Sequence, residues 1–173
     1  MINMTTALIF AGGTSTRMGR DKAKMFGGVS RLYDECVAAK ITQVITLCGG
    51  QERRSNFPGK VWADPQECKN LIQVTQWAIN RVNDDIILIP CDAFNLTVNG
   101  ITELTLLTNC VPSDELGARQ PLHARITDKS QINWQANSIS GLFEDFDTHQ
   151  SKTLAAEFTN FNSPEDLKNH RLQ

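Results

Sequence analysis

The sequence predicts a doubly wound α/β fold, in which a mostly parallel sheet is flanked by helices. The first indication is that short apolar runs alternate with amphipathic helical stretches through the first half of the chain. The second is residues 86–89, four consecutive apolar side chains, a pattern typical of a strand buried on both faces of a parallel sheet. The chain has 173 residues, so we expect one domain over residues 1–173 with a full hydrophobic core.

The strand that opens the fold is predicted at residues 7–10, and a glycine-rich, basic loop follows it. Glycines allow positive φ angles and close approach of a ligand, and consecutive backbone N–H groups form a site for anions. The alternative is a polar turn without function. Three glycines, three hydroxyls and three cations fall within eleven residues, which favours a phosphate cradle: Gly12, Gly13, Thr14, Ser15, Thr16, Arg17, Gly19, Arg20 and Lys22.

The next elements alternate as a doubly wound sheet requires. After a turn at residues 26–28, we expect a helix over 30–40, strands at 43–48 and 61–63, and a helix over 70–81. The stripes that should pack against the sheet are Leu32, Tyr33, Cys36 and Val37 in the first helix and Leu71, Val74, Ala78, Ile79 and Val82 in the second. The buried run at 86–89 then ends in Pro90, Cys91 and Asp92.

The second half is less regular. We expect a helix over 101–109, a return strand at 118–126 with its hairpin turn near 113–117, helical pieces over 128–147, and a last strand at 155–159. A helix should then begin with Ser163 as N-cap, Pro164 at the first helical position and Asp166 at the capping-box position.

The composition argues against several classes of protein. A net charge of -2 disfavours a general binder of nucleic acid or membrane surfaces. No apolar run could span a bilayer, and no signal peptide is recognisable. The five cysteines are widely spaced and never form a Cys-x-x-Cys pair, which favours reduced thiols over a disulfide or zinc framework. We therefore expect a cytoplasmic protein with no nucleic-acid and no membrane partner.

Aspartates that follow buried strands are the best candidates for chemistry. Asp92 should lie at the carboxyl end of its strand, where open α/β sheets bind ligands, and could supply the carboxylate that Mg²⁺ needs beside a triphosphate. Asp64 follows the third strand in the same way. For both, the alternative is an aspartate that caps a turn. Lys22 should contact phosphate with help from Arg17, and Asp21 should order the loop by pairing with its cations.

Residues 11–22 closely resemble the signature loop of the molybdenum cofactor guanylyltransferases, with Phe10 in place of a leucine. The segments 90–92 and 160–167 resemble two further motifs of that family. The resemblance implies a Rossmann-like fold of nucleotide-diphospho-sugar transferase type and a Mg²⁺-dependent transfer of GMP from GTP to molybdopterin, with release of pyrophosphate. GTP, molybdopterin and other proteins of molybdenum cofactor synthesis are the partners that it suggests.

The resemblance also implies roles for individual residues. Catalysis would fall to Lys22, Arg17 and Asp92, with Asp92 as the metal ligand. Asn160 and Asn162 would lie on the pterin side. The nucleotide would be bound by Phe10, Ala11, Gly12, Gly13, Lys22, Asp64 and Asp92.

One departure keeps other functions open. The family carries a Gly-Pro-Leu-Ala-Gly loop shortly after the position of Asp64, whereas residues 65–71 here contain no glycine. Loss of those glycines could change the contacts to base or phosphate. The alternatives are a cytidylyl- or sugar-phosphate nucleotidyltransferase, or a nucleotide-binding protein of this type without catalysis.

Overall fold

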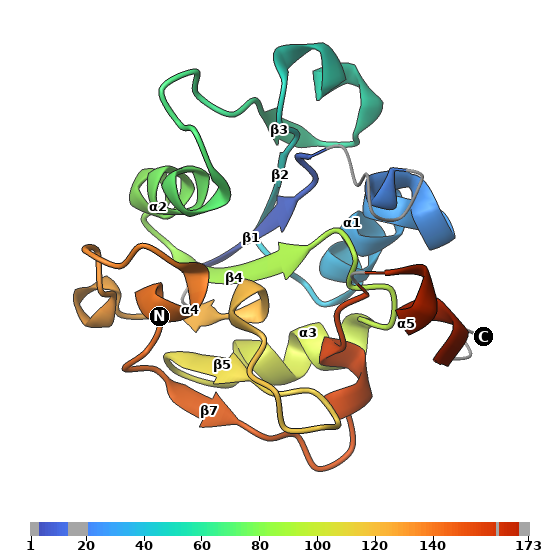
Figure 1. The fold of residues 1–173 in the computed structure, drawn as a ribbon, viewed down its shortest axis with the longest axis vertical. Coiled ribbons are helices and arrows are strands. Elements are labelled where there is room, and N and C mark those ends of the chain that lie inside the picture. Colours follow the sequence, from blue (N-terminus) through green and yellow to red (C-terminus); the bar gives the residue numbers. More distant parts are fainter. Residues whose placement is uncertain (1–3, 14–20, 162, 170–173) are drawn as a thin grey trace.

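The computed structural model describes residues 4–13, 21–161 and 163–169, and a single mixed sheet runs through this part of the chain (Figure 1). The strand order is β3-β2-β1-β4-β6-β5-β7. The strands are β1 (Thr5–Phe10), β2 (Gln43–Leu47), β3 (Lys60–Trp62), β4 (Asp85–Pro90), β5 (Cys110–Pro112), β6 (Arg125–Ile126) and β7 (Asp147–His149). The α-helices are α1 (Gly28–Ala38), α2 (Leu71–Arg81), α3 (Val98–Thr105), α4 (Ile139–Leu142) and α5 (Pro164–Asn169). The 3-10 helices are η2 (Lys22–Gly27), η3 (Gln51–Asn56), η4 (Pro121–His123), η5 (Lys129–Gln131) and η6 (Ala155–Phe158).

The predicted doubly wound architecture is confirmed. β1 lies between β2 and β4 and pairs with both in parallel, and β3 extends the parallel part beyond β2. Alternate residues of β1 enter two different cores: Ala7 and Ile9 pack on the face of α1 and α3, and Leu8 and Phe10 on the face of α2. Figure 1 shows α1 and α2 on opposite sides of these strands. Burial on both faces explains why β1 and β4 are apolar runs without alternation.

Both early helices form, and one residue of each predicted stripe lies outside the core. α1 begins at Gly28, so Val29 joins Leu32 in the core, whereas Val37 near the end of the helix is 55% exposed. Leu71 is the first residue of α2 and is 44% exposed. It lies at the carboxyl edge of the sheet, where it lines a pocket instead of packing under the helix.

The second half contains the largest error of the sequence prediction. Residues 155–159 do not form the last strand, because residues 155–158 form η6, closed by a hydrogen bond from Glu157 N to Leu154 O at 2.9 Å. The final strand is instead β7, which pairs in parallel with β5. The turn of η6 buries Phe158 completely while the neighbouring Glu157 reaches α3, an arrangement that local sequence does not encode.

Other features of this half are confirmed in outline. The predicted hairpin is present, with Ser113 paired to Arg119, although η4 interrupts its return strand. The third helix begins at Val98 and ends at Thr105, earlier at both ends than expected. The capping box before α5 forms as predicted: Ser163 N donates to Asp166 Oδ2 at 2.8 Å, and Asp166 N donates to Ser163 Oγ at 3.3 Å.

Two expectations about the whole chain can be compared with the structure. All five cysteines are free thiols, as predicted. Within the described residues, no helix combines the length and the apolar character needed to cross a membrane.

Candidate active site at the carboxyl edge of the sheet

The carboxyl ends of four neighbouring strands lie in one row. Backbone hydrogen bonds join Cys91 N to Phe10 O at 3.1 Å, Ala11 N to Leu47 O at 2.8 Å, and Cys48 N to Trp62 O at 2.9 Å. These bonds continue the ladders of β4, β1, β2 and β3 by one residue. The chain segments that follow these strands, including those of Gly12, Asp64 and Asp92, therefore leave the sheet at the same edge, the usual place for ligands in such folds.

The turn after β1 is packed closely against the turn after β2. A Cβ on Gly12 would lie 3.3 Å from the Cα of Gly49 and 3.4 Å from Asp64 Oδ2. Gly13 and Gly49 have φ angles of +97° and +80°, in the region that glycine adopts without strain. The glycines thus bring the backbone of the predicted cradle against the segment that carries Asp64.

A pocket of about 400 Å³ opens beside this turn. Its lining residues are Phe10, Gly12, Gly13, Leu47, Asp64, Cys68, Lys69, Asn70, Leu71 and Val74. Asp64 Oδ1 is buried and has no hydrogen-bond partner among the described residues, and burial raises the pKa of this carboxyl group. A buried oxygen of this kind suits a hydroxyl or N–H donor from a ligand. The pocket therefore holds four of the predicted nucleotide-binding residues.

Lys22 and Asp92, far apart in the sequence, form an ion pair at the same edge. Lys22 Nζ lies 3.0 Å from Asp92 Oδ2, and the two side chains are only 13% and 10% exposed. Burial raises the pKa of Asp92, and Lys22 counteracts this rise. The pair places an ammonium group, which could bind phosphate, beside a carboxylate, which could bind a metal, in a partly desolvated position where both interact strongly with charge.

The residues around Asp92 fit Mg²⁺ held jointly by protein and substrate. In the described part of the chain, no three His, Cys, Asp or Glu side chains gather into a metal-binding group. Mg²⁺ commonly takes only one or two carboxylates and completes its coordination with phosphates and water. Asp92 can serve as such a carboxylate, and the negative charge of Asp166 also acts on it.

Arg53 is a further cation at this edge, and the sequence does not predict its role. Its Nη1 donates to Ala11 O at 2.7 Å and to Gly13 O at 3.3 Å, and its Nη2 donates to Asp21 Oδ2 at 2.8 Å. Asp21 does pair with a cation, but this cation is Arg53 of η3, whereas the sequence predicted pairing with the cations of the loop itself. The Arg53 side chain thus connects Ala11 and Gly13, before residues 14–20, with Asp21, after them. No local motif marks Arg53, because its partners lie 32 to 42 residues away.

Asn160 lies at the centre of a second group of polar side chains. Its Nδ2 donates to Gln120 Oε1 at 2.6 Å, so its Oδ1 faces His123 Nε2 at 3.2 Å. His123 therefore carries its proton on Nε2, and its buried Nδ1 has no partner in the described structure. Complete burial lowers the pKa of His123 to about 4, which keeps the ring neutral. The sequence predicts only a strand over residues 118–126, and nothing local marks Gln120 or His123 as partners of Asn160.

A small apolar cluster joins the segment that carries Asp92 to the segment that carries Asn160. Met25, Phe94 and Phe161 pack against one another, and the rings of Phe94 and Phe161 lie 5.4 Å apart. Phe94 follows Asp92 by two residues and Phe161 follows Asn160 directly. Of the remaining predicted residues, Phe10 and Ala11 are buried at the end of β1. Arg17 and Asn162 lie outside the described residues.

Comparison with known proteins gives a family and a fold. Residues 7–143 match the model of the MobA-like NTP transferase domain. A search of curated proteins gave no match. A solved protein from Aquifex aeolicus VF5 superposes with a TM-score of 0.73 at 18% identity, over 94% of this chain and 96% of that one.

Two further solved structures carry an enzyme name. A nucleotidyl transferase from Methanothermobacter gives a TM-score of 0.67 at 12% identity, over 96% of this chain and 95% of the other. The 4-diphosphocytidyl-2C-methyl-D-erythritol synthase of Anaerococcus prevotii DSM 20548 gives 0.58 at 12% identity, over 96% of both chains. At such identities these likenesses establish the fold, which is the predicted nucleotide-diphospho-sugar transferase type.

Proposed function

The chain belongs to the family of MobA-like NTP transferase domains, and on that premise we propose that it transfers GMP from GTP to molybdopterin. Membership of the family supports nucleotidyltransferase activity. The guanine nucleotide and the pterin acceptor are the specific part of the proposal. They are supported by the resemblance of residues 11–22 and 160–167 to the motifs of molybdenum cofactor guanylyltransferases.

One observation supports the proposal: groups suited to bind a nucleoside, a phosphate and a metal ion lie at a single edge of the sheet. The glycine turn and Asp64 line a pocket of about 400 Å³ that suits a nucleoside. The ion pair of Lys22 and Asp92 lies where β4 ends, joined to β1 by the bond from Cys91 N to Phe10 O. A nucleotide with its base and ribose in the pocket can therefore direct its phosphates toward Lys22 and Asp92.

The protein groups would act mainly by positioning and by neutralising charge, as in phosphoryl transfer generally. Backbone N–H groups of the glycine turn and the ammonium group of Lys22 would bind the triphosphate. A terminal phosphate oxygen of the acceptor attacks the α-phosphorus in line, a P–O bond forms, and the bond to the bridging oxygen of the β-phosphate breaks. Pyrophosphate leaves with that oxygen. Asp92 would hold Mg²⁺, which would withdraw charge from the phosphate oxygens.

The acceptor side is proposed to include Asn160. Gln120 and His123 use one hydrogen of its amide nitrogen and one lone pair of its oxygen. The remaining hydrogen and lone pair can then recognise an acceptor in a fixed orientation. Asn162 and Arg17 keep the roles proposed from the sequence, on the pterin side and at the triphosphate.

The decisive experiment is pyrophosphate release from GTP, CTP and ATP, each with Mg²⁺ and molybdopterin, followed by mass spectrometry of the product. We expect release from GTP and a product heavier than the acceptor by one GMP unit. Preference for CTP, or activity only with a sugar phosphate, would instead favour one of the other transferases. Tight nucleotide binding without release under any condition would favour a binding protein.

A further inference from the structure

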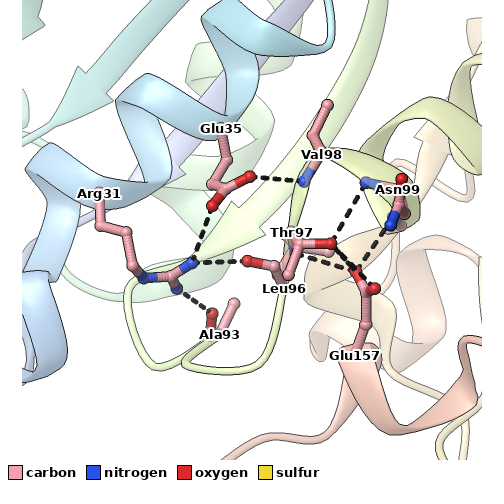
Figure 2. A network of polar contacts seen from close by, with 9 residues as sticks. Arg31, Glu35, Ala93, Leu96, Thr97, Val98, Asn99 and Glu157 are labelled. Carbon is pink, nitrogen blue, oxygen red and sulfur yellow. Dashed lines mark hydrogen bonds and ion pairs between the residues drawn. The ribbon is translucent and has the colours of Figure 1, made fainter. Parts of the chain in front are cut away.

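One carboxylate joins the segment before Asn160 to the segment after Asp92. Glu157 in η6 accepts hydrogen bonds from the backbone N–H groups of Thr97 at 2.9 Å and Gly100 at 3.0 Å. The Thr97 hydroxyl donates to the same carboxylate at 2.9 and 3.0 Å (Figure 2). A Cβ on Gly100 would lie 2.4 Å from Glu157 Oε2, so only glycine lets the carboxylate reach this amide.

Helix α1 holds the same connection, residues 93–98, from the other side. Arg31 donates from Nη1 to Leu96 O at 2.6 Å and from Nη2 to Ala93 O at 2.8 Å. Glu35 Oε2 accepts from Val98 N at 2.6 Å. Figure 2 shows the backbone of this connection between Arg31 and Glu35 on one side and Glu157 on the other. The chain that begins directly after Asp92 is therefore fixed from two directions.

A simpler role for Glu157 would be to cap α3. Two first-turn amides of that helix have other acceptors: Thr97 Oγ1, the N-cap, accepts from Asn99 N at 3.2 Å, and Glu35 accepts from Val98 N. Asn95 adds a second link to η6, from its Nδ2 to Ala156 O at 3.3 Å. Glu157 therefore caps the other two amides, those of Thr97 and Gly100, and because it does so from η6 the cap also links segments about sixty residues apart in the sequence.

We propose that Glu157 is a positioning residue for nucleotidyl transfer, which sets the separation between Asp92 and Asn160. The inference rests on the proposed function, in which Asp92 serves the nucleotide and Asn160 the acceptor. Asp92 directly precedes Ala93, which Arg31 holds, and Asn160 follows Glu157 by three residues. Loss of the carboxylate would let η6 shift against the connection, and misplacement of reacting groups by about 1 Å costs about 100-fold in rate.

The test compares Glu157→Ala and Glu157→Gln with the matched control Glu103→Gln. Glu103 also makes a long-range contact from α3, to His149 Nε2 at 2.6 Å, but on a strand that does not carry the site. For each variant, thermal unfolding, GTP affinity with Mg²⁺, and kcat and acceptor KM for GMP transfer to molybdopterin would be measured.

For Glu157→Ala we expect GTP affinity within about threefold of the wild type, with kcat/KM for the acceptor lower by about 10- to 100-fold. Glu157→Gln should recover part of this loss, because its amide oxygen can still accept from Thr97 N. Glu103→Gln should transfer GMP at the wild-type rate even if its melting temperature falls as far as that of Glu157→Ala. If Glu157→Ala transfers like the control, the positioning role is refuted while the proposed function stands. If the wild-type protein transfers no nucleotide, both fail.

Discussion

The two ends of the sheet position the site by different means. On the side of β1 to β4, strands pair in parallel over three to six residues, and their backbone ladders carry Gly12, Asp64 and Asp92 to one edge. On the side of β5 to β7, strands pair over one to three residues, and Asn160 is held by side chains. A backbone ladder tolerates a changed side chain, whereas a side-chain contact is lost with its residue. Substitutions of site residues should therefore separate function from stability on the first side, whereas substitutions of the side chains that hold Asn160 should disturb both on the second.

Asp92→Asn should give the largest effect and test the first half of this comparison. The ladder of β4 keeps the backbone in place and the Asn oxygen can still accept from Lys22 Nζ, so the fold should persist with only a modest loss of stability, but the charge that a metal needs is removed. Transfer should fall by about 100-fold or more, because metal stabilisation of the transition state contributes several kcal/mol. GTP affinity without metal should change little. The measurement is Mg²⁺-dependent pyrophosphate release beside GTP binding, with Asp34→Asn, an exposed change in α1, as control.

Wild-type turnover in Asp92→Asn would exclude Asp92 as the essential ligand. A large loss of stability would contradict the contrast between the two sides of the sheet.

The side of β5 to β7 is tested by the way in which His123 makes the stability of the protein depend on pH. The native pKa of this ring is about 4, below the ordinary value of 6.5. Between these values the unfolded chain binds more protons than the native protein, so stability falls as pH decreases through this window. The total loss is about 3 kcal/mol for a fully buried ring. His123→Gln should lack this component, so its stability should depend less on pH.

Urea unfolding at several pH values from 7 to 4 would compare wild type, His123→Gln and the control His149→Gln on β7. The control should keep the steep loss. Equal pH dependence in all three proteins would show that His123 is not held as a neutral buried ring.

Arg53 sharpens the comparison because it supplies side-chain hydrogen bonds on the side where backbone ladders position most of the site. Arg53→Ala should weaken GTP binding by about tenfold, since charge-assisted hydrogen bonds to Ala11, Gly13 and Asp21 are lost together, at a net cost of about 1–2 kcal/mol. Arg53→Lys keeps the charge but cannot reach all three oxygens, so it should fall between.

The neighbouring Arg54 is exposed, so Arg54→Ala gives a matched control for the loss of one positive charge. Calorimetric titration with GTP measures all three variants. Equal affinities for Arg53→Ala and Arg54→Ala would mean that the glycine turn keeps its binding geometry without the guanidinium group.

The smallest expected effect concerns base selectivity at the wall of the pocket. Cys68, Lys69 and Asn70 line it and belong to the segment that stands in place of the glycine loop of the guanylyltransferases, and Asn70 also caps α2 by accepting from Gln73 N at 3.0 Å. Replacing residues 65–69 by Gly-Pro-Leu-Ala-Gly preserves this cap. We expect the ratio of GTP to ATP affinity to rise by about threefold, with stability within about 0.5 kcal/mol. Binding titrations with GTP and ATP measure this ratio. An unchanged ratio would show that residues 65–69 do not determine base selectivity.

Much of the parallel side could be predicted from the sequence because its signals are local. Residues 86–89 are apolar without interruption, which specifies a strand buried on both faces, and β4 forms there. Gly12 and Gly13 mark the close turn, and Ser163 with Asp166 marks the start of α5, since each motif satisfies its own backbone groups. Asp64 and Asp92 could be placed at one edge because parallel strands end there.

Only the tertiary structure decided how the remaining groups meet. The pairing of Lys22 with Asp92, the bridge from Arg53 to both sides of residues 14–20, and the contact of Glu157 with α3 join residues 32 to 70 positions apart. The misread segment 155–158 shows the reason. Its four residues contain too few periods to distinguish a strand from a helical turn, and burial of Phe158 together with the hydrogen bonds of Glu157 selects the turn. The local sequence determines the structure of a segment that satisfies its own backbone hydrogen bonds. Where the partners of a segment are distant in the sequence, tertiary contacts determine its structure.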